Sequence, residues 1–258
     1  MIFSVLSIAS LLFFSNPLEA AISPTKNSVP PIEKRKYTEV SQEALRLPVD
    51  HALKVIRGHS KLIDELEAIA FDTSENMDQR WKAFGLVVKT QKENSWPIVE
   101  RGLSSSEWFM KQISLISIGE YHKDRIPTVV PKYLSEKAMV IRSTVVSLLE
   151  TQVGRQEIRD YLWAELNHER NFRMGKSLWV RGQILGVLAK DPVRTELSQF
   201  AKVLQEKDQA MSTQALKSME YLAGKKLGNT NDTLDKKVKL WSQWTKSAEF
   251  KNFERSSF

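Results

Sequence analysis

Apolar residues recur every three or four positions through most of the chain after residue 41. Residues 125–150 read RIPTVVPKYLSEKAMVIRSTVVSLLE, and their many Val and Ile residues would by propensity suit two β-strands. The spacing of Met139, Val145 and Leu149 instead gathers apolar residues on one helix face. The preceding half repeats this spacing, with two prolines where a first helical turn can spare its backbone donors. We therefore predict a helical hairpin whose turn lies at residues 135–138.

The same unit recurs at a fixed spacing. Residues 95–119 again place a proline at the start of one apolar helix and a Leu at its end, followed by a polar turn and a second apolar helix. Equivalent positions of the second helices lie 31, 31, 39 and 31 residues apart, and they are Arg80, Lys111, Arg142, Arg181 and Ser212. A recurring 31-residue register predicts a repeat protein built from stacked helical hairpins.

The repeated unit resembles the short bacterial form of the HEAT repeat, the PBS-lyase-type HEAT-like repeat. The residues that carry the resemblance are Pro127, Leu134, Glu136, Ile141-Arg142 and the apolar run 145–149. The resemblance covers roughly residues 60–222, although Ser105 stands where the family has an acid and Ser212 where it has a basic residue. It implies an all-α fold, a right-handed α-solenoid of about five helical hairpins over residues 41–250. Tetratricopeptide repeats are the competing family, but their Trp, Gly, Tyr and Pro pattern is not visible.

Both ends of the repeat region differ from its middle. Residues 41–71 are expected to hold one or two helices after Pro48, and residues 234–250 one amphipathic helix with Trp241 and Trp244 on one side. Solenoids need such atypical end units to cover their last apolar face, so we expect capping helices at both ends. Residues 251–258 are expected to form a C-terminal tail.

The N-terminal residues carry a different signal. An apolar run from Ile2 to Phe14 has the length of a signal-peptide core and is too short to span a bilayer. Residues 1–20 are therefore predicted to be a cleaved signal peptide, with a single membrane anchor as the alternative, although no Lys or Arg precedes the run. Residues 21–40 are rich in Pro and Lys and are predicted to be a disordered linker. We expect no transmembrane span in the mature chain.

Composition narrows the possible chemistry. The chain has no Cys, which excludes disulfides, thiolate metal sites and a Cys nucleophile. It has four His, and His168-Glu169 is the single His-Glu pair, which supplies too few ligands for a metal site. The sequence has no glycine-rich phosphate loop and no nucleophile elbow. We therefore expect no catalytic residues, no metal and no cofactor.

A basic residue recurs once per repeat and should form a ridge along the stack. Its members are Arg80, Lys111, Arg142 and Arg181. The structural interpretation is that each binds a turn carbonyl or an acid in its own or the next repeat. The alternative is an anion-binding stripe; we favour the structural interpretation because burial beside apolar neighbours suits paired Arg.

The excess of eight residues in the repeat spacing lies mostly at one turn, residues 167–176. Insertions in repeat proteins tend to lie on the binding face, and this one mixes charge with an apolar residue. We predict partner contacts from Arg170, Phe172, Arg173 and Lys176. The alternative is a tolerated surface loop.

These features favour a non-enzymatic scaffold or adaptor that is exported to the periplasm or secreted. The expected partner is a protein or peptide, and the formal charge of +7 favours an acidic one or an anionic envelope surface. The first alternative is nucleic-acid binding, which requires that the chain is not exported. The second is a lyase-like accessory protein, by analogy with other proteins that carry this repeat. The sequence leaves the oligomeric state open.

Overall fold

The computed structural model describes residues 37–59 and 61–255, which belong to one compact unit, Tyr37–Phe258. This part is mostly α-helical, as predicted, with a single two-stranded β-ribbon among the residues described. The predicted signal peptide, the linker up to residue 36 and the last three residues lie outside it. The α-helices are α1 (Glu39–Arg46), α2 (Val49–Arg57), α3 (Lys61–Phe71), α4 (Met77–Gln91), α5 (Trp96–Leu103), α6 (Trp108–Tyr121), α7 (Ile126–Val129), α8 (Met139–Leu149), α9 (Gln156–Leu166), α10 (Trp179–Lys190), α11 (Leu197–Leu204), α12 (Gln209–Ala223), α13 (Leu234–Trp244) and α14 (Ala248–Arg255).

Short 3₁₀ helices complete several of the connections. They are η1 (Lys92–Ser95), η2 (Lys123–Arg125), η3 (Pro131–Ser135), η4 (Glu150–Gln152), η5 (Glu169–Asn171) and η6 (Arg194–Glu196). The β-ribbon consists of β1 (Phe172–Arg173) and β2 (Lys176–Ser177), which pair antiparallel.

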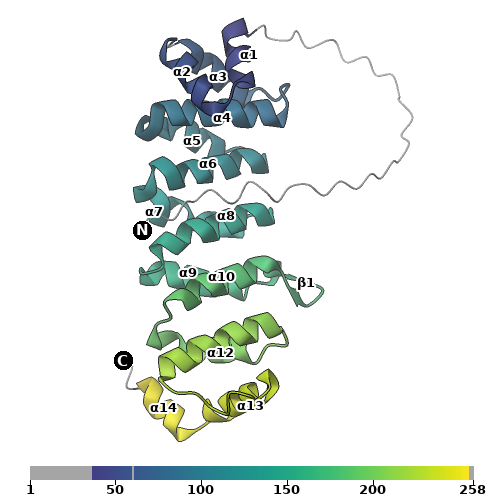
Figure 1. Ribbon diagram of the computed structural model, residues 1–258, viewed down its shortest axis with the longest axis vertical. Helices are drawn as coiled ribbons and strands as arrows, with labels where there is room; N and C mark the ends of the chain where they lie inside the picture. Colours follow the sequence, from purple (N-terminus) through teal and green to yellow (C-terminus); the bar gives the residue numbers. More distant parts are fainter. Residues whose placement is uncertain (1–36, 60, 256–258) are drawn as a thin grey trace, which may run out of the picture. The chain divides into compact units, whose positions relative to one another are not determined.

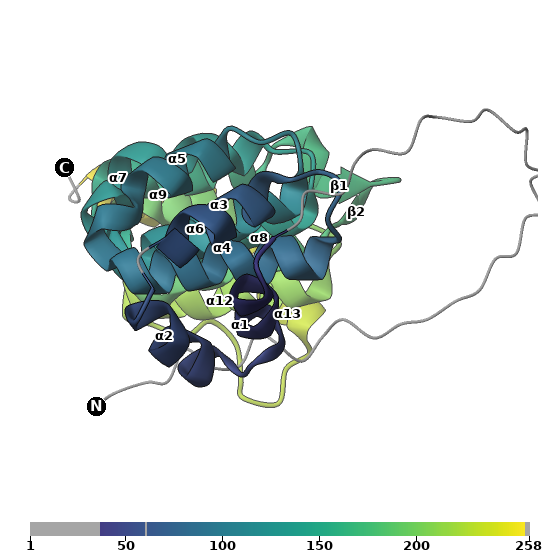
Figure 2. The same cartoon turned by 90° about the horizontal axis from the view of Figure 1, so that it is seen from above.

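The even-numbered helices from α4 to α12 form one row in which each helix contacts the next (Figure 1). Each also packs against the helical segment that precedes it, so that α5, α7 and α9 lie along the other side (Figure 2). We call each such unit a helix pair and its even-numbered member the second helix. Second helices are enclosed by three neighbours, which explains why α6 buries Met110, Ile113 and Leu115 around much of its circumference.

The first helix of the pair around residue 130 is broken. The first half of the predicted hairpin is not a single α-helix, because α7 ends at Val129 and the chain continues as η3. Pro131 has no N–H to donate, and its ring would clash with the carbonyl of residue 127 in a continuing α-helix. The break leaves Val130 and Leu134 buried against α8, so the pair still contributes to the core.

The two ends also differ from prediction. A helix, α1, precedes Pro48, and it begins inside the segment predicted as linker because the Thr38 hydroxyl caps it by accepting from the Ser41 N–H. At the other end, residues 245–247 divide the predicted single helix into α13 and α14, and α14 extends to Arg255 into the predicted tail. The break lets Phe250 fold back onto Trp244, whose ring also meets that of Trp241 edge-on at 5.0 Å.

A buried ion pair joins two adjacent helix pairs. Arg159 on α9 donates from Nε to Glu196 at the end of η6 over 2.6 Å, and both residues are only 2% exposed. The same guanidinium donates to the backbone oxygens of Leu188 and Val153. Its charge and most of its donors are therefore satisfied inside the protein, which a buried guanidinium requires.

We expect Glu196→Gln to destabilise the protein by about 3–5 kcal/mol, because it leaves the Arg159 cation buried without a counter-charge. Urea unfolding followed by circular dichroism measures this loss. The matched control is Glu157→Gln, which removes the exposed ion pair with Arg155 and should cost less than about 1 kcal/mol. Equal losses for the two variants would contradict the assigned role of the buried pair.

Candidate functional site

Three of the four ridge cations are bound to carboxylates within the fold. Arg80 donates to Glu107 across 2.7 Å and Lys111 to Glu136 across 2.6 Å, each carboxylate belonging to the turn of the following helix pair. Arg181 donates to both carboxylate oxygens of Glu206 at 2.8 Å in the same way. These charges are engaged in joining one helix pair to the next.

The two arginines also bind their own helix pair. Nε of Arg80 donates to the carbonyl of Ala70 at the end of α3, and Nε of Arg181 donates to that of Leu166 at the end of α9. These carbonyls lie in the last turn of a helix, where no helical partner is available. Each guanidinium therefore fixes a first helix, a second helix and the next turn relative to one another.

Arg142 is the exception in this series. It is 3% exposed, and its guanidinium donates to the backbone oxygens of Glu136 (2.7 Å) and Lys137 (3.0 Å) rather than to a carboxylate. Its Nε has no hydrogen-bond partner. Desolvation by burial lowers the pKa of Arg142, and the charge of Arg170 adds to this effect while Glu165 opposes it. The turn that would supply the next acid is the 167–176 insertion.

The insertion folds into a β-hairpin that projects from the helices (Figures 1 and 2). Phe172 packs under the guanidinium of Arg181, with 4.2 Å between the Arg181 Cζ and the ring centre. The buried Asn171 donates to both the carbonyl (2.7 Å) and the carboxylate (2.9 Å) of Glu165, and Leu178 N–H closes the base by donating to the Asn171 carbonyl. The hairpin is therefore held at its base by buried contacts.

The four residues predicted to contact a partner fall into two groups. Arg170 donates to His168 and lies 3.6 Å from Glu165, while Phe172 is half-buried, so both stabilise the base of the hairpin. Arg173 and Lys176 are exposed and form the cross-strand pair next to the tip. The structure thus leaves these two cations available to a partner.

Met174 at the tip is a residue that the sequence analysis missed. It is 93% exposed and has φ of 51°, followed by Gly175 with φ of 73°. Two positive φ angles define the type I′ turn of a two-residue hairpin, which favours Asn-Gly. An L-residue other than Gly, Asn or Asp pays about 1–2 kcal/mol for this conformation. The Met-Gly dipeptide within the insertion was the sequence signal from which this turn could have been predicted.

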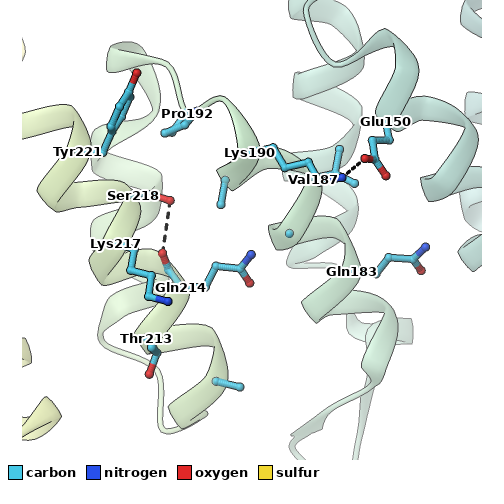
Figure 3. A pocket seen from close by; sticks show the side chains of 13 residues that line it. Glu150, Gln183, Val187, Lys190, Pro192, Thr213, Gln214, Lys217, Ser218 and Tyr221 are labelled. Atoms are coloured by element: carbon cyan, nitrogen blue, oxygen red, sulfur yellow. Dashed lines mark hydrogen bonds and ion pairs between the residues drawn. The ribbon is translucent and has the colours of Figure 1, made fainter. Parts of the chain in front are cut away.

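A groove of about 830 Å³ lies between α10 and α12 and reaches the end of α8 (Figure 3). Gly186 lines it without a side chain, and a Cβ there would come within van der Waals distance, 3.5 Å, of the Gln214 amide nitrogen. The polar and charged residues that line it are Glu150, Gln183, Lys190, Thr213, Gln214, Lys217, Ser218 and Tyr221. None of these residues was identified from the sequence, because the groove depends on which faces of the two helices meet.

The groove carries a small positive charge. Its one carboxylate, on Glu150, is paired with Lys190, whereas Lys217 makes no ion pair with any residue the structure describes. The amide of Gln183 is directed by two donations, to Ser143 O (3.1 Å) and Ser147 Oγ (2.9 Å). On the α12 wall, the Gln214 amide and the Tyr221 hydroxyl can pair with the backbone of an extended peptide, and Lys217 can pair with an acidic side chain.

The strongest candidate for catalytic chemistry is a buried Ser–His pair. Ser95 Oγ lies 3.0 Å from His122 Nε2, but Ser95 is fully buried and His122 nearly so. Ser95 Oγ also donates to the Lys92 carbonyl, so its proton is used and the His122 Nε2–H donates to it. A neutral imidazole that donates to a buried hydroxyl fixes the packing of η1 against the end of α6; it does not present a nucleophile to solvent.

Neither a metal-binding cluster nor a membrane-spanning helix is found among the residues that the structure describes. No three His, Asp or Glu side chains there come together in a way that would hold a metal ion. No helix between residues 37 and 255 combines the length and the apolar character needed to cross a bilayer.

Comparison with protein-family models gives no match to this chain, and comparison with curated proteins also gives none.

We expect the stability of the protein to fall as the pH drops below 6.5, in part because of His122. Desolvation and the charge of Arg125 lower the pKa of His122 from its ordinary value of 6.5. The unfolded chain therefore binds more protons in this range, and the free energy of unfolding decreases with falling pH. His122→Gln keeps the donor but cannot titrate, so urea unfolding between about pH 7.5 and 5.5 should show a shallower slope. An identical slope in both proteins would exclude this role.

Proposed function

We propose that this chain is a non-enzymatic HEAT-like repeat protein, a right-handed α-solenoid of about five helical hairpins with a cap at each end, that binds another protein. The 31-residue register and the row of helices from α4 to α12, each in contact with the next, support the repeat architecture. Solenoids present extended surfaces, and their usual use is to bind proteins or peptides.

The groove between α10 and α12 is the observation that carries the proposal. Its volume of about 830 Å³ accommodates several residues of an extended chain, and its α12 wall offers the Gln214 amide and the Tyr221 hydroxyl beside Lys217. The partner is a protein or peptide with an extended acidic segment, because Lys217 is the charge that the groove leaves unpaired. The ridge cations give no support to a phosphate-binding stripe for nucleic acid, since three of the four already bind carboxylates.

We propose further that the protein acts as a scaffold or adaptor in the periplasm or cell envelope, or after secretion. The apolar run from Ile2 to Phe14 and the small residues near Ala20 support export with removal of residues 1–20.

Filling the groove should weaken partner binding. A photo-crosslinking residue at Thr213 captures the partner in cells, and the purified partner is then titrated against variants. Gly186→Leu should raise Kd at least about tenfold, because its side chain occupies the groove. Gly182→Leu, on the same helix but outside the lining, should change Kd by less than about twofold. Both variants replace a helical Gly and should keep or raise the melting temperature. Equal affinities would remove the groove from the proposal.

Export predicts a shortened mature chain. N-terminal sequencing and intact mass of the protein from its native host should show that residues 1–20 are absent and that the protein is found outside the cytoplasm. A full-length chain in the cytoplasm would reject the localisation and return the nucleic-acid alternative to consideration.

A further inference from the structure

We propose that the β-hairpin is a second contact site, which inserts Met174 into an apolar pocket on the partner whose rim carries carboxylates. This inference rests on the proposed protein-binding function and adds a defined contact outside the groove.

The tip presents an apolar side chain at a conformational cost. Met174 is the most exposed of the large hydrophobic residues in the described chain, and its φ of 51° is one that Asn or Gly adopts more readily. The turn itself therefore does not require Met, and strain of this kind concentrates at binding sites. An unbranched thioether adapts its shape to an apolar pocket, and Met is enriched at protein interfaces.

The base of the hairpin is organised before any partner arrives. Phe172 lies under Arg181, which is fully buried and bound to Glu206, and Asn171 is fixed by Glu165. A preorganised element loses little conformational entropy on binding, so more of the contact energy appears as affinity. The rigid base is the reason that one side chain at the tip can act as an anchor.

The charge of the β-hairpin determines which groups should surround the pocket on the partner. Arg173 and Lys176 flank the tip, are exposed and make no ion pair with a described residue. At the base, Arg170 lies 3.6 Å from Glu165, Arg142 donates only to backbone oxygens, and Glu169 is the second carboxylate of the segment. The four cations Arg142, Arg170, Arg173 and Lys176 thus outnumber the two carboxylates. This region therefore carries excess positive charge, and carboxylates around the partner's pocket complement it.

Other occupants fit these observations less well. One Met is a weak membrane signal, because stable anchoring needs a second one such as an acyl chain or a larger apolar face. Strands of two residues each, Phe172–Arg173 and Lys176–Ser177, are too short to extend a partner's β-sheet. A protein pocket that receives the tip is the occupant that uses both the apolar and the charged residues.

The experiment starts from the full chain with a photo-crosslinking residue in place of Met174, and with the same residue at Gly154, in another exposed turn, as the control. The protein captured at position 174 and not at position 154 is purified, and its Kd is measured for wild type, Met174→Asn, Arg173→Glu/Lys176→Glu and Met77→Asn. Met77 is a second exposed Met, so Met77→Asn is the matched control for the chemical change.

We expect Met174→Asn to raise Kd at least about tenfold while the melting temperature stays the same or rises, because Asn relieves the strained turn. The charge reversal Arg173→Glu/Lys176→Glu should also raise Kd relative to wild type, by a factor that becomes smaller at high salt. Met77→Asn should leave Kd unchanged. An unchanged Kd for Met174→Asn overturns the inference, as does a crosslink at position 174 only to lipid, to a second copy of the chain, or to nothing. If the partner still requires an open groove in that case, the proposed function stands and only the hairpin contact fails.

Discussion

The arrangement of the helices depends on one interaction. A cation on a second helix binds a carbonyl of its own helix pair and a carboxylate of the next helix pair. Arg80 and Arg181 make both contacts, and Lys111 makes the second. Apolar burial alone would allow neighbouring helix pairs to slide or rotate, because it is not directional. Charged hydrogen bonds in partly buried turns have a defined geometry and contribute about 1.5–3 kcal/mol each, which sets the position of each pair on the next.

The series is interrupted at one place, and the structure is most unusual there. Arg142 meets only backbone oxygens because the following turn is the insertion and not a short acidic turn. The insertion compensates by packing Phe172 on Arg181 and by burying Asn171, so the helices stay in register while a β-hairpin projects outward. A local departure from the repeat thus produces both the excess of positive charge and the rigid element that displays it.

The groove has a different origin, in small side chains rather than in an extra segment. Where α10 faces α12, Gly186 presents no side chain to the groove, and Gln214 borders it from the other helix. The groove and the β-hairpin both belong to the part of the chain from η4 to α12, and each leaves basic side chains available. One acidic partner could therefore satisfy both sites, with the groove taking an extended segment and the tip taking a pocket.

The helical class, the 31-residue register, the recurring basic positions and the place of the insertion follow from the sequence, because they depend on residues close together in the chain. Three details were misjudged from the periodic pattern. Pro131 breaks a helix by itself, a ring contact accompanies the break at 245–247, and a side-chain cap starts α1 before Pro48. The pairing of Arg159 with Glu196, the burial of His122, the groove at Gly186 and the anchoring roles of Arg170 and Phe172 could not be derived in this way. They were decided only in the tertiary structure, since each depends on which faces of distant helices meet and on which charged groups lose their water when they do.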